Sequence, residues 1–80
     1  MIQLIVNGQP QLVPGSPKVQ SGEQGRSRTL NITELLQHMG LQGKRIAVER
    51  NGEIVPRSEF EQPILTDGDR LEIVVAVGGG

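Results

Sequence analysis

The residues with the clearest chemical potential are Gly78, Gly79 and Gly80, at the end of the sequence. Glycine has no side chain and tolerates many backbone conformations, so we expect a thin, flexible tail over 77–80. At about 3.3–3.6 Å per residue, the stretch from Val77 to Gly80 reaches roughly 13 Å from the folded body. A carboxylate on such a thread can enter a slot where any Cβ atom would collide. The pattern predicts a carrier whose reactive group is its own C-terminus.

The rest of the sequence offers little other chemistry. The absence of cysteine excludes a thiol nucleophile and fits a reducing cytosol. There is no glycine-rich phosphate loop and no cysteine–histidine metal set. His38 is the only candidate base for the serines, and nothing in the sequence places it beside any of them. A self-contained enzyme is therefore not expected.

The charge pattern favours a protein partner over a nucleic acid. The net charge is −1, which argues against nucleic-acid binding. Residues 47–80 carry seven acidic and three basic side chains, a balance of −4. This half would steer the protein toward a basic partner face, although any single charge is more simply explained as solvated surface.

The apolar start, Met1–Asn7, is too short for a membrane span and lacks the basic residues of a signal peptide.

The tail must be positioned by strands, and two Asn-Gly pairs predict hairpin turns between them. Asn7-Gly8 and Asn51-Gly52 tolerate positive φ. The composition of Thr66–Asp69 predicts another turn. Its two aspartates are not expected to bind calcium, because the further ligands of a calcium loop do not follow them. An apolar, β-branched run over 71–77 predicts a buried last strand that leads into the glycines. The other expected strands cover 2–6, 11–13, 45–50 and 53–55.

A helix is expected to start at Asn31, an N-cap residue whose partner in a capping box is Glu34. Gly40 suits the left-handed position that ends a helix. Phe60, the only aromatic residue, is expected to plug an otherwise aliphatic core, with contact to a binding partner as the alternative. The full expected core is Leu4, Val6, Leu30, Leu35, Leu36, Met39, Ile46, Val48, Leu65, Leu71, Ile73 and Val75.

The stretch 14–28 differs in composition from the rest, since it is rich in glycine, serine and proline. It predicts a long flexible loop, because it has too few apolar residues to order itself. A tolerated insertion is one interpretation. The other is that Lys18, Arg26 and Arg28 contact a partner or a nucleotide.

Together these elements predict a single α+β domain over 1–80. A mixed sheet of four or five strands should pack on the helix over 31–39. Its first and last strands should be parallel at the centre, because the helix region supplies the crossover that such a pair needs.

Three segments resemble the sulfur-carrier protein family of thiamine biosynthesis: Ala47–Phe60, Leu65–Val74 and Gly78–Gly80. The most specific features are the Asn-Gly-x-x-Val-Pro-Arg motif that begins at Asn51 and the Asp-Gly-Asp turn. That family has the β-grasp fold of ubiquitin, which implies the same fold here. The stretch 14–28 departs from the resemblance, because the family has a much shorter link there.

The resemblance also implies a reaction sequence. A ubiquitin-activating-type adenylyltransferase would use ATP and Mg²⁺ to adenylate the carboxylate of Gly80. A persulfide donor protein would then convert it to a thiocarboxylate, and thiazole synthase would receive the sulfur. Gly78 and Gly79 would provide clearance in the partner's slot, while Val77 and Phe60 complete the expected partner-binding residues. The chain would be a cytoplasmic co-substrate that binds no cofactor, nucleic acid or membrane itself.

Two alternatives stay open at this point. One is a sulfur carrier for another pathway, such as molybdopterin synthesis, although Ala76-Val77-Gly78 does not match the Pro-Pro-Val-Ser-type segment of those carriers. The other is a ubiquitin-like modifier or a plain interaction module.

Overall fold

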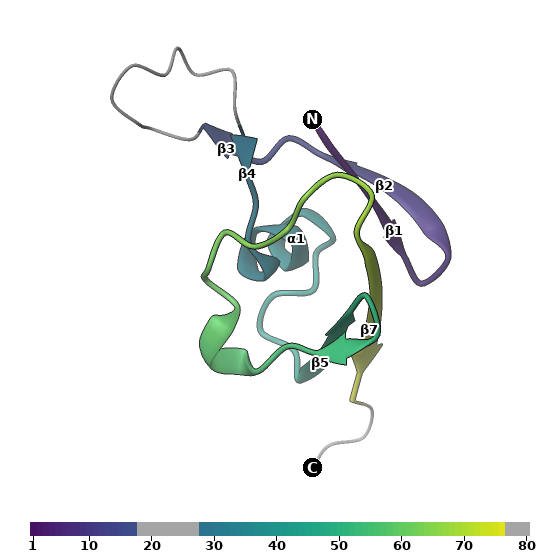
Figure 1. Ribbon diagram of the computed structural model, residues 1–80. Helices are drawn as coiled ribbons and strands as arrows, with labels where there is room; N and C mark the ends of the chain where they lie inside the picture. The colour runs from purple at the N-terminus through teal and green to yellow at the C-terminus, as the bar shows by residue number, and fades with distance from the viewer. Residues whose placement is uncertain (18–27, 77–80) are drawn as a thin grey trace.

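The computed structural model describes residues 1–17 and 28–76. Within these residues the main layer is a five-stranded mixed sheet of order β2-β1-β7-β5-β6 (Figure 1). Helix α1 (Ile32–His38) packs on one face of this sheet, and a short 3₁₀ turn, η1, covers Arg57–Glu59. The strands of the sheet are β1 (Ile2–Val6), β2 (Gln9–Val13), β5 (Ile46–Arg50), β6 (Glu53–Ile54) and β7 (Arg70–Val75). The predicted α+β architecture is confirmed.

Strand β7 lies at the centre of the sheet. It runs parallel to β1, with Val6 opposite Leu71, and antiparallel to β5, with Ile46 opposite Val75. This confirms the prediction that the first and last strands form a parallel central pair. The strand that leads to residues 77–80 is therefore supported on both sides over its first part, and by β5 alone at its end.

Both predicted hairpin turns are present. Asn7 and Gly8 have φ values of 50° and 81°, and Asn51 and Gly52 have values of 51° and 89°. Positive φ at both central residues defines the type I′ turn, whose twist matches that of the flanking strands. The local sequence signal therefore fixed the turn type as well as its place.

The caps of α1 also agree with the sequence. The backbone N–H of Glu34 donates to Asn31 Oδ1 at 2.7 Å, and the backbone N–H of Asn31 donates to Glu34 Oε1 at 3.0 Å. At the other end, Gly40 has a φ of 72° and the N–H of Leu41 donates to the carbonyl of Leu36 at 2.8 Å. These bonds satisfy backbone groups that the ends of a helix leave without partners.

The core differs from the prediction near the ends of elements. Met39 and Val75 are only partly buried, because Met39 is the helix C-cap and Val75 ends β7. The buried residues that the prediction left out are Ile2, Val13, Ile32 and Val55. Val55 lies beyond β6, but its N–H donates to the carbonyl of Val48 and this bond turns it toward the core.

Short paired strands lie at the two ends of the stretch 14–28, for which a flexible loop was predicted; residues 18–27 lie outside the described residues, so the flexibility of the loop stays a prediction. Two short strands, β3 (Ser16–Pro17) and β4 (Arg28–Thr29), pair with each other in an antiparallel ladder. The backbone at residue 15 lies close to that of Thr29, and only a glycine fits there, because a Cβ atom on residue 15 would lie 2.9 Å from the carbonyl oxygen of Thr29. Lys18 and Arg26 lie outside the described residues, so their predicted contact with a partner stays a prediction.

Candidate functional site

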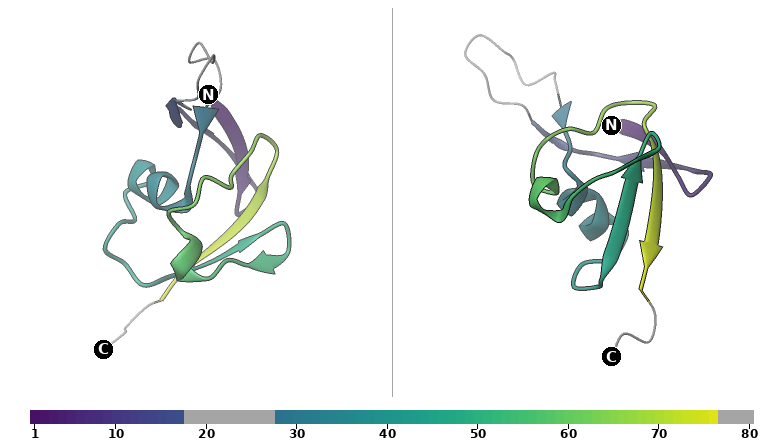
Figure 2. Two further views of the ribbon diagram at one scale, coloured as in Figure 1. Left: turned by 60° about the vertical axis from the view of Figure 1, so that its left-hand side comes forward. Right: turned by 60° about the horizontal axis from the view of Figure 1, so that its bottom comes forward.

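The candidate site is the end of β7, from which the chain continues into Val77, Gly78, Gly79 and Gly80. The N–H of Ala76, the last described residue, donates to the carbonyl of Arg45 at 2.8 Å. At this end of the sheet β7 extends past the turn between β1 and β2 (Figure 2). The four predicted tail residues themselves lie outside the described part of the chain.

On its β1 side, β7 is held by the side chain of Asn7. The backbone of Asn7 turns away at a φ of 50°, so its own carbonyl leaves the ladder. The side chain of Asn7 instead binds the next residue of β7: the N–H of Ile73 donates to Asn7 Oδ1 at 2.7 Å, and Asn7 Nδ2 donates to the carbonyl of Ile73 at 3.1 Å. The amide therefore extends the short parallel ladder by one more residue of β7.

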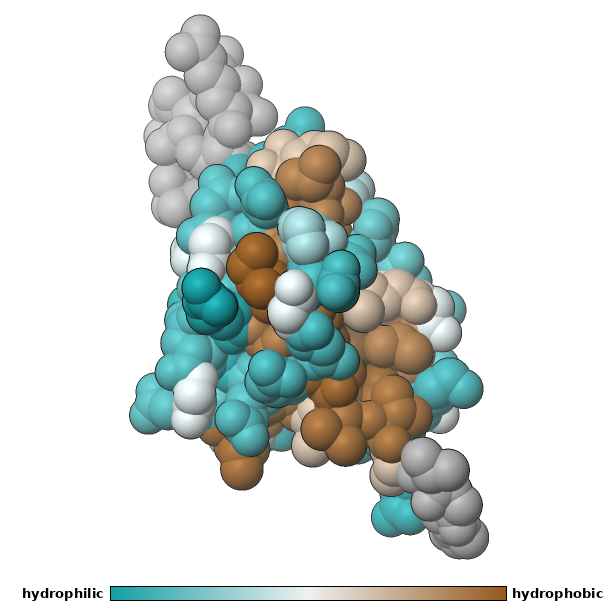
Figure 3. Space-filling view, turned by 90° about the vertical axis from the view of Figure 1, so that its right-hand side faces the viewer, coloured by the Kyte–Doolittle hydropathy of each residue, from teal (hydrophilic) through white to brown (hydrophobic). Residues whose placement is uncertain are grey.

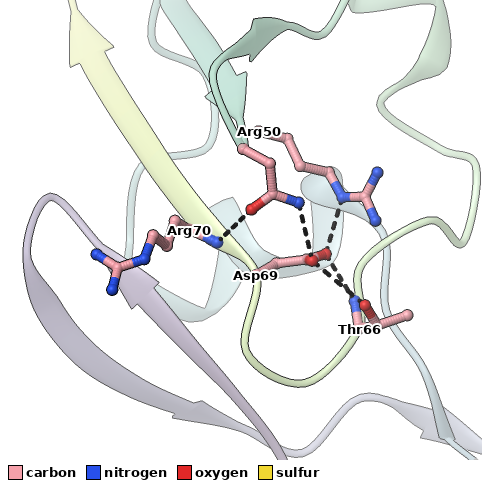
Figure 4. Close-up of polar contacts among 5 residues, drawn as sticks. Arg50, Thr66, Asp69 and Arg70 are labelled. Carbon is pink, nitrogen blue, oxygen red and sulfur yellow. Dashed lines mark hydrogen bonds and ion pairs between the residues drawn. The ribbon is translucent and has the colours of Figure 1, made fainter.

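At its start, β7 is held by the carboxylate of Asp69, which is only 7% exposed. Arg50 Nε donates to it at 2.8 Å, the backbone N–H of Thr66 at 2.9 Å and Asn51 Nδ2 at 3.1 Å (Figure 4). Asn51 Oδ1 in turn accepts from the N–H of Arg70 at 2.9 Å. This cluster joins the β5–β6 turn, the turn before β7 and the first residue of β7.

Two opposing effects act on the acidity of Asp69. Burial by itself would raise the pKa of this carboxyl group, because it disfavours the charged form. The hydrogen bonds from Thr66, Arg50 and Asn51, together with the charge of Arg50, outweigh burial and hold the pKa below its ordinary value. The ionised form of Asp69 is therefore the one that stabilises the start of β7.

The outer face of β7 is partly apolar. The side chains of β7 alternate, with Leu71 and Ile73 buried and Glu72 and Val74 exposed. Val74 is 63% exposed and lies opposite Ala47 of β5, which is also exposed. Figure 3 shows a face of the molecule on which apolar side chains gather at the lower right, next to hydrophilic ones.

The apolar run over 71–77 had predicted a buried strand, and this prediction was wrong for Val74. No described element covers the outer face of the sheet, so residues of alternate parity reach solvent there. Ile54 of β6 and Leu12 of β2 are likewise 74% and 55% exposed. Period-two alternation was the signal that could have identified this surface.

Phe60 lies on the opposite, helix side of the sheet. It packs against the core as predicted, and its carbonyl accepts from the N–H of Thr33 at 3.1 Å. It also lines a hollow of about 140 Å³, together with Leu36, Leu41, Ile46 and the cationic residues Lys44 and Arg57. Because Ile46 is the partner of Val75, this hollow lies near the same end of β7 as the tail.

The described residues hold few other candidates for chemistry. His38 is exposed at the end of α1. Among the residues that the structure describes, no three histidine or acidic side chains are grouped so that they could hold a metal ion. No helix within that part of the chain has the length and apolar character needed to cross a membrane.

Comparisons with known proteins support the fold. The sequence model of the ThiS family matches residues 4–80. The chain is similar to the sulfur carrier protein ThiS of Bacillus subtilis, with 42% identity over 52 residues that cover 65% of this chain and 79% of that protein. A crystal structure of the thiamine biosynthesis protein ThiS from Geobacter metallireducens has a TM-score of 0.68 and 35% identity, and the match covers 99% of this chain and 100% of that one. The mixed sheet and its helix thus form a ThiS-like β-grasp structure.

A further relative is much longer. The thiazole synthase of Paramagnetospirillum magneticum is 37% identical over 79 residues, which are 99% of this chain but 20% of that protein. This chain therefore spans about a fifth of the length of that relative.

Proposed function

Because the chain belongs to the ThiS family, the sulfur carriers of thiamine biosynthesis, we propose that its reactive group is the carboxylate of Gly80. One observation carries the proposal: the family match runs through Gly80, and the strand that leads to this residue is the central strand of the sheet. The folded body presents the tail, and other proteins supply the catalytic groups.

The proposed first step is activation of the carboxylate. An adenylyltransferase of the ubiquitin-activating type holds ATP and Mg²⁺, and a carboxylate oxygen of Gly80 attacks the α-phosphorus. Pyrophosphate leaves and an acyl-adenylate forms. The partner supplies the cations and backbone donors that stabilise the developing charge. A carboxylate is a poor acyl donor, and the adenylate is a good one.

The second step transfers sulfur. The outer sulfur of a persulfide on a donor protein attacks the acyl carbon of Gly80, and AMP leaves. A second thiol then attacks the sulfur–sulfur bond, so that a disulfide forms on the donor side and a thiocarboxylate remains on Gly80. Thiazole synthase takes this sulfur. The long relative supports that acceptor, because a thiazole synthase contains a region similar to this entire chain.

Within the chain, the proposal assigns presentation roles. Gly78 and Gly79 give clearance in the partner's slot, and Val77 lies at its entrance. The exposed apolar surface at Val74 and Ala47 contacts the adenylyltransferase, since it adjoins the strand that leads to the tail. The hollow beside Phe60 offers a second contact near the same end of β7. The chain acts in the cytoplasm as a co-substrate, and ATP and Mg²⁺ are held by its partner.

Intact mass spectrometry tests the proposal directly. The protein is incubated with the adenylyltransferase, ATP, Mg²⁺ and a persulfide donor. The expected product has gained the mass difference between one sulfur and one oxygen, and thiazole synthase removes that gain. An isopeptide bond to a lysine would instead identify a modifier, and an unchanged mass would identify an interaction module.

A further inference from the structure

The backbone groups of β7 face two different neighbours in alternation. Toward β5, Arg70 accepts from the N–H of Asn51 at 2.7 Å, and Ala76 donates to Arg45 at 2.8 Å. Hydrogen-bonded pairs alternate along an antiparallel ladder, so the even-numbered residues of β7 point their N–H and C=O groups toward β5. The odd-numbered residues, Leu71, Ile73 and Val75, point theirs toward the β1 side.

The partners on the β1 side end before the strand does. The carbonyl of Leu71 accepts from the N–H of Asn7 at 2.8 Å. Both backbone groups of Ile73 are bound by the side chain of Asn7. Val75 comes next, and among the described residues neither its N–H nor its carbonyl has a partner on this side. Figures 1 and 2 both show β7 continuing past the β1–β2 turn at this point.

We propose that this free edge at Val75 pairs with an extended segment of the adenylyltransferase, which adds a strand to β7. The inference rests on the proposed function, because it concerns how the activating partner takes hold of Gly80. A free strand edge is a template for another strand. The free part of the edge begins after Ile73, because the side chain of Asn7 already binds the backbone groups of Ile73.

The position of the free edge at Val75 indicates which protein would pair with it. Four residues separate Ala76 from the end of the sequence, and they span roughly 13 Å when extended. A protein that holds the carboxylate of Gly80 in its active site must therefore lie beside the end of β7.

Pairing through the backbone also suits a tail without side chains. Hydrogen bonds to N–H and C=O groups recognise an extended chain whatever its residues, so glycines can be bound and aligned in this way. The apolar outer face at Val74 lies on the same strand and adds a side-chain contact to the partner. The edge would thus set the register of the tail before the carboxylate reaches ATP.

Hydrogen exchange of backbone amides, followed by NMR with and without the adenylyltransferase, tests the inference without any substitution. The N–H of Val75 should exchange rapidly in the free protein and at least about tenfold more slowly in the complex. The N–H of Val74, which points toward β5, is the internal control and should be protected in both states. Unchanged exchange at Val75 in the complex would overturn the inference.

A pair of variants provides a second test. Val75→Pro removes the free N–H and blocks the edge, but leaves the β5 ladder intact because that N–H points away from β5. Val75→Ala keeps the N–H and is the matched control, and urea unfolding shows whether both variants fold. Loss of one hydrogen bond predicts a rise in Kd for the partner of roughly 3- to 10-fold for Val75→Pro relative to Val75→Ala.

Two outcomes would contradict this assignment. Equal Kd values for the two variants would show that the edge is not used. Concentration-dependent protection of Val75 in the free protein would assign the edge to a second copy of this chain. Neither outcome affects the sulfur-carrier proposal, which fails only if the carboxylate of Gly80 is not thiocarboxylated.

Discussion

At the scale of single residues, two turn asparagines act on the strand that leads to the tail. Asn7 and Asn51 each adopt positive φ, and each side chain binds the backbone of β7, Asn7 at Ile73 and Asn51 at Arg70. Asn51 also donates to the carboxylate of Asp69. The side chains of the two hairpin turns therefore hold β7 in place from opposite sides.

Asp69→Asn should destabilise the fold. The substitution removes the charge and one acceptor oxygen from a buried cluster, so we expect the free energy of unfolding to fall by roughly 1–3 kcal/mol. Urea unfolding at neutral pH measures it. Asp67→Asn is the matched control, because Asp67 is exposed and the amide keeps the Oδ1 acceptor that binds the N–H of Gln3. Equal losses for both variants would contradict a special role for Asp69.

The same carboxylate predicts how stability depends on pH. Because the pKa of Asp69 is lowered in the folded state, its contribution is complete above the unfolded-state value. That contribution is lost as the pH falls below about 4 and through the lower folded-state pKa. Between neutral pH and about pH 3, Asp69→Asn should lose less free energy of unfolding than the wild type. A wild type and variant that lose the same amount would exclude this linkage.

Gly79→Ala tests the clearance argument. One added methyl group should collide in the partner's slot and lower kcat/KM for adenylation at least about tenfold, which corresponds to about 1.4 kcal/mol. Pyrophosphate release measures the rate. The urea midpoint is the control and should not change, because residue 79 lies beyond the last strand of the sheet. A variant that is thiocarboxylated at the normal rate would show that no tight slot exists.

At the scale of elements, β7 combines a buried inner face with an exposed outer one. Leu71 and Ile73 anchor it to the core under α1, and Val74 faces solvent. Transfer of a valine side chain from water to an apolar contact contributes roughly 1.5–3 kcal/mol. The outer face is therefore able to contribute substantially to binding while the inner face keeps the strand folded.

Val74→Glu should weaken binding of the adenylyltransferase at least about tenfold, because it places a charge in an apolar contact. Stability should change by less than about 1 kcal/mol, since the side chain is exposed. Calorimetric titration measures the affinity. Leu12→Glu is the matched control on β2, at the edge of the sheet away from β5 and β6. Similar losses for the two variants would show that the contact is not centred on β7.

The elements could be predicted from the sequence to different degrees. Asn-Gly pairs, the capping box at Asn31 and the glycine at position 40 are local signals, and each one determined the structure around it. The asparagine side-chain bonds to β7 were not predicted, because their partners are 19 and 66 residues away. Pairing of Ser16–Pro17 with Arg28–Thr29 was missed for the same reason, since the segments look unstructured when they are considered alone.

At the scale of the whole molecule, the strand order places at the centre the strand that leads to the proposed reactive residue, Gly80. The order β2-β1-β7-β5-β6 gives β7 a neighbour on each side, while β2 and β6 form the edges. The parallel central pair was predicted from the sequence, because a parallel first and last strand needs the crossover that the helix region provides, but the full strand order was not predicted. For the candidate site, the tail and Phe60 were predicted from the sequence and stay predictions, whereas the exposed surface at Val74 and the free edge at Val75 depend on where neighbouring strands end.

The central claim is that the protein carries sulfur on the carboxylate of Gly80, and intact mass measurement of two proteins tests it most directly. The full chain and a chain that ends at Gly78 are each incubated with the adenylyltransferase, ATP, Mg²⁺ and a persulfide donor. The account predicts exchange of one oxygen for one sulfur in the full chain and no change in the shortened one. Sulfur gained equally by both chains, or by neither, would contradict it.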